Sequence, residues 1–386
     1  MGVLRLTLAT AVVCWHGGPF LGLRVMPGDT AVQTFFLLSG FYMALVLHTK
    51  YRGPGSYRLF LSNRFLRLFP AYWAVLAATF ATCLVLQSVK GHSRLSAYDH
   101  PLSPFAFVFL VVTNLAVFGQ DAVMFLGLSP SGRLVPTANF RLTRPELNTF
   151  LLIPQAWSLG VELTFYLVAP FLARKRSRTV AGLFLASWAL RLWIYYGLGL
   201  KFDPWTGRFF PTELALFLLG VLSYRGLERL RGRVLPRGTV GLVSLGFLGL
   251  TLGFSALPSL PFHGGWLLKH WGYFGLTGLA IPFVFLASEN SRLDRYAGDL
   301  SYPLYITHGL VLMVFEAGLP PDVLNGLVAR SLYTPAVLGC SLLISAALLR
   351  FLIDPLERYR QGRVRPRPDR PRVARGSPAP ALTVGP

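Results

Sequence analysis

Eleven apolar stretches, separated by shorter polar or basic segments, set the pattern of the chain. Most of them approach the about 20 residues that a helix needs to cross a bilayer. They lie at residues 3–23, 30–48, 70–89, 104–124, 152–172, 179–198, 209–224, 238–257, 270–288, 299–317 and 331–353. No repeat with a period of 20–50 residues stands out. The pattern predicts an all-α, polytopic bundle of transmembrane helices that forms one membrane-embedded domain over residues 1–360.

The composition agrees with a membrane protein and excludes a string of soluble domains. Hydrophobic residues make up 53% of the 386 positions and charged residues 14%, against about 25% charged residues in a soluble domain. The net charge of +21 on so apolar a chain is typical of an orientation signal, so we expect no nucleic-acid partner. The three cysteines lie in apolar stretches without the short spacing of a metal site, so we expect no bound metal.

The basic segments predict the orientation, because Lys and Arg gather in the cytoplasmic loops of membrane proteins. They lie at residues 49–69, 173–178, 225–237 and 289–297 and in the tail from Arg350 onward. All of them face the cytoplasm if one of the three stretches between segments 49–69 and 173–178 does not cross, which places 25 Lys or Arg inside and 10 outside. We therefore expect about ten spans and cytoplasmic termini, with 104–124 as the stretch that does not cross.

The last residues differ from the rest of the chain. Residues 361–386 are rich in Arg and Pro and show no apolar periodicity. Such a composition cannot bury enough apolar surface to fold, so it predicts a disordered cytoplasmic tail. Its positive charge favours contact with anionic lipid.

Ionisable residues inside a membrane cost at least about 2.5–3.5 kcal/mol each, so each is a candidate functional group. Arg5 and His16 stand eleven residues apart in the first stretch. In a helix this spacing puts both on one face, about 16 Å apart along the axis. The alternative is that Arg5 reaches the lipid headgroups and His16 caps the helix.

Two arginines lie where the chain enters the third stretch. Arg64 and Arg67 have the i, i+3 spacing that shares a helix face. Guanidinium pairs bind phosphates through bidentate hydrogen bonds. The alternative is ordinary positive charge in a cytoplasmic loop.

A carboxylate interrupts the stretch at 152–172. Glu162 lies one helical turn before Tyr166, whose hydroxyl can donate a hydrogen bond to it. A buried carboxylate is either paired or protonated, and Arg5 and Arg191 are its candidate partners in the membrane. The alternative is a purely structural ion pair.

A polar stripe marks the stretch at 299–317. Ser301, Tyr305 and His308 have the i, i+4, i+7 spacing of one helix face. A polar stripe in the membrane faces protein or a cavity rather than lipid. The alternative for His308 is a core histidine whose hydrogen bonds are satisfied.

The order of these motifs resembles the integral-membrane acyltransferase family 3, bacterial O-acyltransferases that modify envelope glycans, exopolysaccharides and some antibiotics. The resemblance covers nearly all of residues 1–360. It rests on the Arg-x10-His spacing from Arg5 to His16, the run from Phe35 to Phe41, the Asn-Arg-x-x-Arg-x-x-Pro segment from Asn63 to Pro70, the Trp-Ser-Leu-x-x-Glu segment from Trp157 to Glu162, and the segment from Leu300 to His308.

The resemblance implies an O-acyltransferase in the bacterial inner membrane, with acyl-CoA, and acetyl-CoA in particular, as donor. The implied acceptor is a hydroxyl of a glycan, a glycolipid or a secondary metabolite. We expect His16, Arg5 and Glu162 to be catalytic, with His16 as general base or as the carrier of an acyl group. We expect Arg64, Arg67 and Arg58 to hold the donor phosphates, and Trp157, Ser301, Tyr305 and His308 to contact substrate.

Two other functions remain open on the sequence alone. A secondary transporter would use intramembrane charge, but it predicts repeated, Gly- or Pro-broken helices that the sequence does not show. A glycan ligase or flippase with a lipid-diphosphate sugar would also need arginines for phosphate. Labelled acyl-CoA separates these from an acyltransferase, because neither consumes it.

Overall fold

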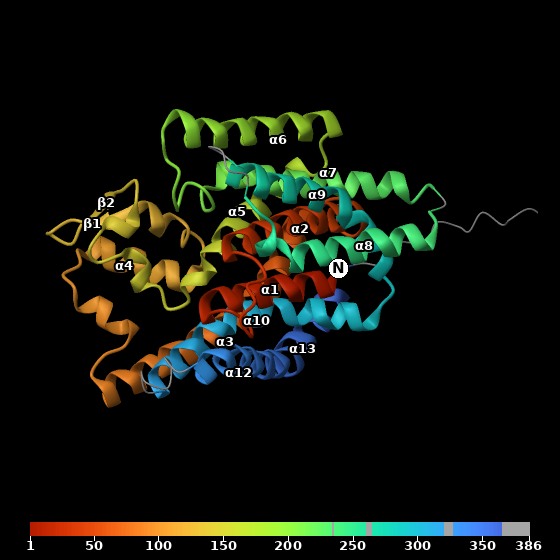
Figure 1. Ribbon diagram of the computed structural model, residues 1–386. Coiled ribbons are helices and arrows are strands. Elements are labelled where there is room, and N and C mark those ends of the chain that lie inside the picture. Colours follow the sequence, from red (N-terminus) through yellow and green to blue (C-terminus); the bar gives the residue numbers. More distant parts are fainter. Residues whose placement is uncertain (234, 260–264, 320–326, 365–386) are drawn as a thin grey trace, which may run out of the picture.

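The fold is a bundle of helices, and the computed structural model describes residues 1–233, 235–259, 265–319 and 327–364 (Figure 1). The helices are α1 (Gly2–Gly17), α2 (Gly28–Thr49), α3 (Ser56–Lys90), α4 (Pro104–Ala116), α5 (Trp157–Leu172), α6 (Ser177–Leu192), α7 (Phe210–Leu230), α8 (Arg237–Leu252), α9 (Gly265–Ser288), α10 (Arg292–Gly318), α12 (Leu327–Leu348) and α13 (Asp354–Gly362). One antiparallel hairpin joins β1 (Leu126–Leu128) to β2 (Leu134–Pro136). The predicted all-α class is confirmed, and the tail from residue 365 lies outside the described residues.

Six helical segments in the described part of the chain are long and apolar enough to cross a membrane. They are Gly28–Thr49, Ser56–Lys90, Ser177–Gly197, Leu267–Ser288, Arg292–Gly318 and Leu332–Gly362. The stretch expected not to cross contains α4, whose 13 residues extend only about 20 Å against about 30 Å of hydrocarbon. The count of ten spans and the cytoplasmic termini stay predictions.

The first apolar stretch forms a shorter helix than its length suggests. α1 ends at Gly17, because Gly18 adopts a φ of 103°, which interrupts the helix. The hydroxyl of Thr334 donates to the carbonyl oxygen of Gly17 at 2.8 Å, so a residue of α12 satisfies this helix end. His16 therefore stands in the last turn of α1, with Arg5 near its start.

The centre of the bundle is the close contact of α2 with α7. A Cβ atom on Gly40 would lie 1.9 Å from the carbonyl oxygen of Phe217, and one on Gly220 would lie 2.0 Å from that of Leu37. Only glycine permits backbones this close, as in other membrane helix pairs. This contact fixes α2, which carries the Phe35 to Phe41 motif, in the middle of the molecule.

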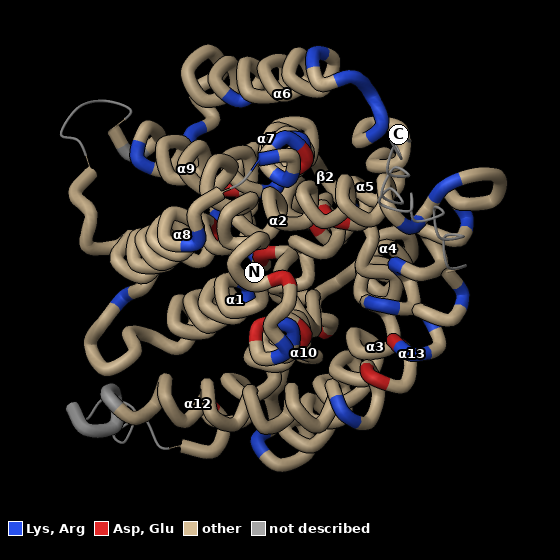
Figure 2. The backbone as a smooth tube through the Cα atoms, turned by 90° about the vertical axis from the view of Figure 1, so that its right-hand side faces the viewer, with Lys and Arg blue, Asp and Glu red and all other residues tan. Residues whose placement is uncertain are grey.

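The predicted basic segments meet at one end of the bundle. The Arg174 guanidinium donates to the carbonyl oxygen of Tyr51 at 2.5 Å, and that of Arg225 to the carbonyl oxygen of Lys175 at 3.1 Å. Arg231 forms an ion pair with Glu289 at 2.6 Å. Figure 2 looks onto this end, where the N-terminus also lies. At the other end α4 and the β1–β2 hairpin project from the bundle (Figure 1).

Arg191 has a carboxylate partner, but it is not the predicted Glu162. Its guanidinium forms a hydrogen-bonded ion pair with Glu213 of α7, whose side chain is fully buried. The side-chain amide of Gln33 donates to both carboxylate oxygens of Glu213, at 3.2 and 3.1 Å. The pair thus ties α2, α6 and α7 together and leaves Glu162 to other partners.

Removing one partner of this pair is expected to destabilise the protein by about 3–5 kcal/mol, because the other charge stays buried without compensation. We expect Glu213→Leu or Arg191→Leu alone to lower the unfolding temperature in detergent markedly. The double variant Arg191→Leu/Glu213→Leu leaves no unpaired charge and is expected to recover most of the loss. A double variant no more stable than the single ones would contradict the ion pair.

Candidate active site

A large cavity opens among α1, α2, α3, α5, α10 and α13. Its volume is about 780 Å³, within the range of small-molecule and cofactor sites. It lies on the same side of the bundle as the basic loops, since Lys50, Tyr51 and Glu289 are among its lining residues. It brings together six of the ten predicted site residues: Arg5, Arg64, Arg67, Glu162, Ser301 and Tyr305.

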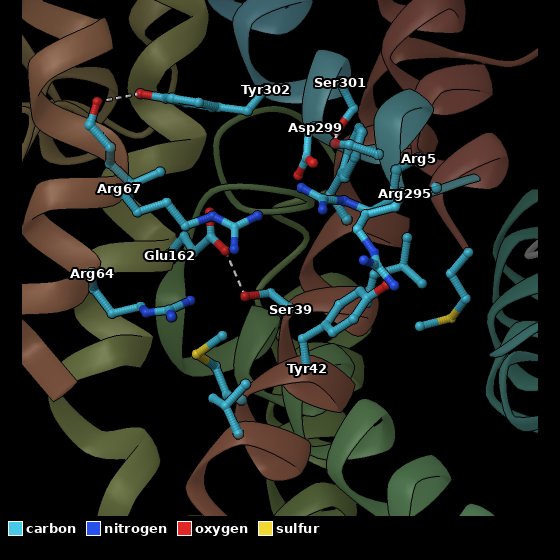
Figure 3. A pocket seen from close by; sticks show the side chains of 18 of the residues that line it. Arg5, Ser39, Tyr42, Arg64, Arg67, Glu162, Arg295, Asp299, Ser301 and Tyr302 are labelled. Atoms are coloured by element: carbon cyan, nitrogen blue, oxygen red, sulfur yellow. Dashed lines mark hydrogen bonds between the residues drawn. The ribbon is translucent and has the colours of Figure 1, made fainter. Parts of the chain in front are cut away.

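Several arginines line this cavity, and three of them, Arg5, Arg64 and Arg67, are predicted site residues (Figure 3). Arg64 and Arg67 reach in from α3, and Arg5 reaches in from α1. Within the described ranges, none of the three has a carboxylate oxygen within the 4.0 Å of an ion pair. The Nε of Arg64 is buried without a hydrogen-bond partner there, and the side chain of Arg64 is 5% exposed. Buried donors without partners are costly, so the cavity is suited to an anionic ligand.

The local structure explains why two arginines of α3 share this site and a third does not. Arg64 and Arg67 lie on one helix face, and the Asn63 amide donates to the Tyr51 hydroxyl at 3.1 Å, which anchors this turn. Arg58, which the sequence also assigned to the donor phosphates, is six residues earlier and about 240° around the helix from Arg64. It is exposed and does not line the cavity.

Glu162 stands between the arginines and α2. Its Oε1 accepts a hydrogen bond from the Ser39 hydroxyl at 2.5 Å (Figure 3) and another from the Tyr166 hydroxyl at 2.6 Å. The predicted donation from Tyr166 is therefore confirmed, and Ser39 is a partner that the sequence did not reveal. These two bonds fix the carboxylate beside Arg67 and Arg5, which both act on it electrostatically.

Tyr305 and Ser158 form the inner end of the cavity. The Tyr305 hydroxyl donates to the carbonyl oxygen of Gln155 at 2.8 Å and forms a hydrogen bond with the Ser158 hydroxyl at 2.7 Å. The amide of Gln155 in turn donates to the carbonyl oxygen of Ile306 at 3.2 Å. These bonds join the start of α5 to the polar stripe of α10, and Tyr305 and Ser158 form part of the cavity wall.

The two histidines do not line the cavity and lie behind Tyr305. The Nε2 of His308 is 3.3 Å from the Nδ1 of His16, and the two rings stack with centroids 5.2 Å apart. The Tyr305 ring is 6.0 Å from the His308 ring, so Tyr305 contacts both the cavity and the histidine pair. His308 is 1% exposed, whereas His16 is exposed at the end of the bundle opposite the basic loops.

Arg208 is a functional candidate that the sequence interpretation missed. Its guanidinium lies 4.1 Å over the ring of Trp157, and Asp203 binds it through two hydrogen bonds at 2.5 and 2.8 Å. Arg208 acts electrostatically on both His16 and Asp121. Burial raises the pKa of the Asp121 carboxyl to about 6. Trp157, Asp121 and the Asp203–Arg208 pair lie in three different segments of the sequence, so the sequence interpretation did not bring them together.

Comparisons with known proteins agree with this arrangement. The model of acyltransferase family 3, described as an acyltransferase domain, matches residues 1–350. The chain is 32% identical over 162 residues to "Protein 2 in picA locus" of Rhizobium radiobacter, an alignment that covers 42% of this chain and 74% of that protein. No solved structure matches the chain. With a match over about nine-tenths of its length, the chain belongs to acyltransferase family 3, a family of membrane-bound acyltransferases.

Proposed function

We propose that this protein transfers an acyl group, in the simplest case acetyl, from a cytoplasmic acyl-CoA to a hydroxyl of an envelope carbohydrate or a similar acceptor. The observation that carries the proposal is the cavity with three guanidinium groups that have no ion-pair partner among the described residues. A donor with several phosphates supplies the negative charge that pairs with the guanidinium groups of Arg5, Arg64 and Arg67. The proposal places the enzyme in the bacterial inner membrane as a multi-pass protein.

The donor is proposed to enter from the end where the basic loops meet. Arg64 and Arg67 present guanidinium forks that suit phosphate oxygens. The part of the donor that carries the acyl thioester then extends past Glu162 and Ser301 toward Tyr305. Arg5 stabilises charge near the thioester. The acyl carbon must pass the Tyr305–Ser158 hydrogen bond to reach the histidines, so this bond opens during the reaction.

The chemistry is nucleophilic attack on a thioester by an alcohol. His16 is proposed to take the proton of the acceptor hydroxyl while its oxygen attacks the acyl carbon. The C–S bond breaks, and the coenzyme A sulfur leaves with the proton that His16 returns. Attack by His16 itself, with an acyl-histidine intermediate, uses the same residues in two steps. Trp157 with Arg208 lies at the side where the acceptor arrives.

Two alternative functions fit parts of the site. A glycan ligase or flippase that uses a lipid-diphosphate sugar would use the same arginines, and a secondary transporter would use the same cavity. Family membership favours acyl transfer over both. The test supplies purified protein in detergent or nanodiscs with acyl-labelled acetyl-CoA and a hydroxyl acceptor extracted from bacterial envelopes. We expect label on the acceptor and an equal amount of free coenzyme A thiol. Intact acetyl-CoA, with activity only from a lipid-diphosphate sugar, would overturn the proposal.

A further inference from the structure

The contacts of the His16 ring determine which of its nitrogens carries a proton. The Nδ1 of His16 is 3.0 Å from the backbone carbonyl oxygen of Val12, one turn earlier in α1. A carbonyl oxygen only accepts hydrogen bonds, so this Nδ1 is a donor and carries the proton. The same Nδ1 is 3.3 Å from the Nε2 of His308.

The protonation of His308 follows from that of His16. An N–H group that already faces a carbonyl cannot accept a hydrogen bond, so the Nε2 of His308 is unprotonated and accepts. The proton of neutral His308 then lies on its Nδ1, which is buried. Both histidines are thus neutral with the proton on Nδ1, and the Nε2 of His16 has a free lone pair.

The surroundings of the pair oppose a positive charge on it. Arg208 and Arg94 are the charged groups that act electrostatically on His16. Tyr305 packs against His308 from one helical turn earlier in α10 and carries no charge. A proton taken up by His16 is therefore stabilised locally by the Val12 carbonyl and by the His308 Nε2, the two acceptors at its Nδ1–H.

We propose that His308 is a positioning residue for acyl transfer, whose Nε2 accepts from the Nδ1–H of His16 and stabilises the imidazolium ion that forms on it. This inference rests on the proposed function. During attack, the acceptor O–H proton moves to the Nε2 of His16 as the ester C–O bond forms and the C–S bond breaks. The Nδ1–H of His16 meanwhile donates to the His308 Nε2, and the Nε2 proton of His16 then passes to the departing sulfur. Through one neutral acceptor, His308 performs the role that a carboxylate performs beside the histidine of a Ser-His-Asp triad.

The chain offers a matched set of variants at this position. In His308→Gln an amide oxygen can occupy the place of Nε2, whereas in His308→Asn the shorter side chain stops near the place of Nδ1. His308→Phe keeps the ring and removes the acceptor. We expect His308→Phe and His308→Asn to lower kcat about 10- to 100-fold, as the loss of a supporting hydrogen bond does at other sites. We expect His308→Gln to stay within about threefold of the wild type and the KM for acyl-CoA to change little in all three, because the donor cavity is untouched.

Unfolding temperatures in detergent show whether a variant has lost its structure. Equal temperatures for the His308→Gln and His308→Phe proteins make the kinetic comparison between them valid. A His308→Gln protein as slow as the His308→Phe protein, or a His308→Phe protein with wild-type kcat, would overturn the positioning role.

A second measurement does not depend on activity. Nitrogen-15 shifts of histidine-labelled protein report which ring nitrogen carries the proton, and the His16 signals are identified by their loss in His16→Gln. We expect the Nδ1-protonated form in the wild type, and also in His308→Phe, where the Val12 carbonyl still accepts from Nδ1. A His16 protonated on Nε2 in the wild type would refute the inference even if acyl transfer is observed. The expected form in a protein that transfers no acyl group would instead refute the proposed function alone.

Discussion

His16→Ala is expected to lower the rate of acyl transfer by about 10²- to 10⁴-fold, the usual contribution of a general base. The reason is the free Nε2 of an exposed imidazole, which lies behind the cavity proposed to bind the donor. The alcohol is a poor nucleophile at neutral pH, and His16 is the exposed member of the histidine pair that lies behind Tyr305. The measurement is the initial rate of coenzyme A release in nanodiscs at saturating donor and acceptor.

The matched control for this prediction is His92→Ala. His92 is an exposed histidine whose ring contacts the carbonyl oxygen of Lys90, away from the cavity. It is expected to keep the wild-type rate. Both variants are expected to insert and to bind acyl-CoA as the wild type does, because His16 does not line the cavity. A His16→Ala protein with wild-type turnover would remove His16 from the mechanism.

The sequence predicts local relations well. The spacing of Arg5 and His16 placed them on one face of a helix, and the structure shows both on α1. The spacing of Glu162 and Tyr166 predicted a hydrogen bond that is present at 2.6 Å. Such relations depend on 3.6 residues per turn and need no knowledge of the tertiary fold.

Contacts between distant segments could not be predicted in the same way. His16 and His308 are 292 residues apart, and only the packing of α1 on α10 brings their rings together. The sequence made Arg191 a candidate partner for Glu162, because both are charged residues in apolar helices. In the structure α6 packs on α7, so Arg191 lies next to Glu213 of α7. The sequence shows which buried charged residues need partners, but the packing of the helices determines which residues pair.

The division of the site in two is also a tertiary property. The motifs suggested one catalytic set, whereas the structure places Arg5, Arg64, Arg67 and Glu162 in the cavity and the histidines behind Tyr305. A donor that enters from the cavity reaches the histidines only by passing the hydrogen bond of Tyr305. For an enzyme that joins a donor from one side of a membrane to an acceptor from the other, such a separation keeps water away from the thioester.

The double variant Arg64→Ala/Arg67→Ala is expected to raise the KM for acyl-CoA by about 10²- to 10⁴-fold. Hydrogen bonds to charged groups contribute about 1.5–3 kcal/mol each, and each 1.4 kcal/mol is a tenfold change in binding. Each single variant is expected to lose about 10- to 100-fold. The measurement is the donor dependence of coenzyme A release, supported by direct titration of a non-hydrolysable acyl-CoA analogue.

Arg58→Ala is the matched control for these variants. It removes the same charge from the same helix, but at an exposed position outside the cavity, so we expect the KM to stay within about twofold of the wild type. A loss equal to that of Arg64→Ala would mean that the net charge of α3, rather than phosphate contact, attracts the donor. Higher salt would then abolish the difference between wild type and variants.

The ligand-free protein gives an independent check on the arginines. An arginine whose guanidinium pairs with a buried carboxylate stabilises the fold, as Arg191 does by pairing with Glu213. Arg64 has no such carboxylate, and its Nε is buried without a partner among the described residues. We therefore expect Arg64→Ala to leave the unfolding temperature unchanged or raise it without ligand, and to lose the stabilisation that acyl-CoA gives the wild type, because a ligand stabilises only the state that binds it. A large drop in the ligand-free unfolding temperature would show that Arg64 is structural.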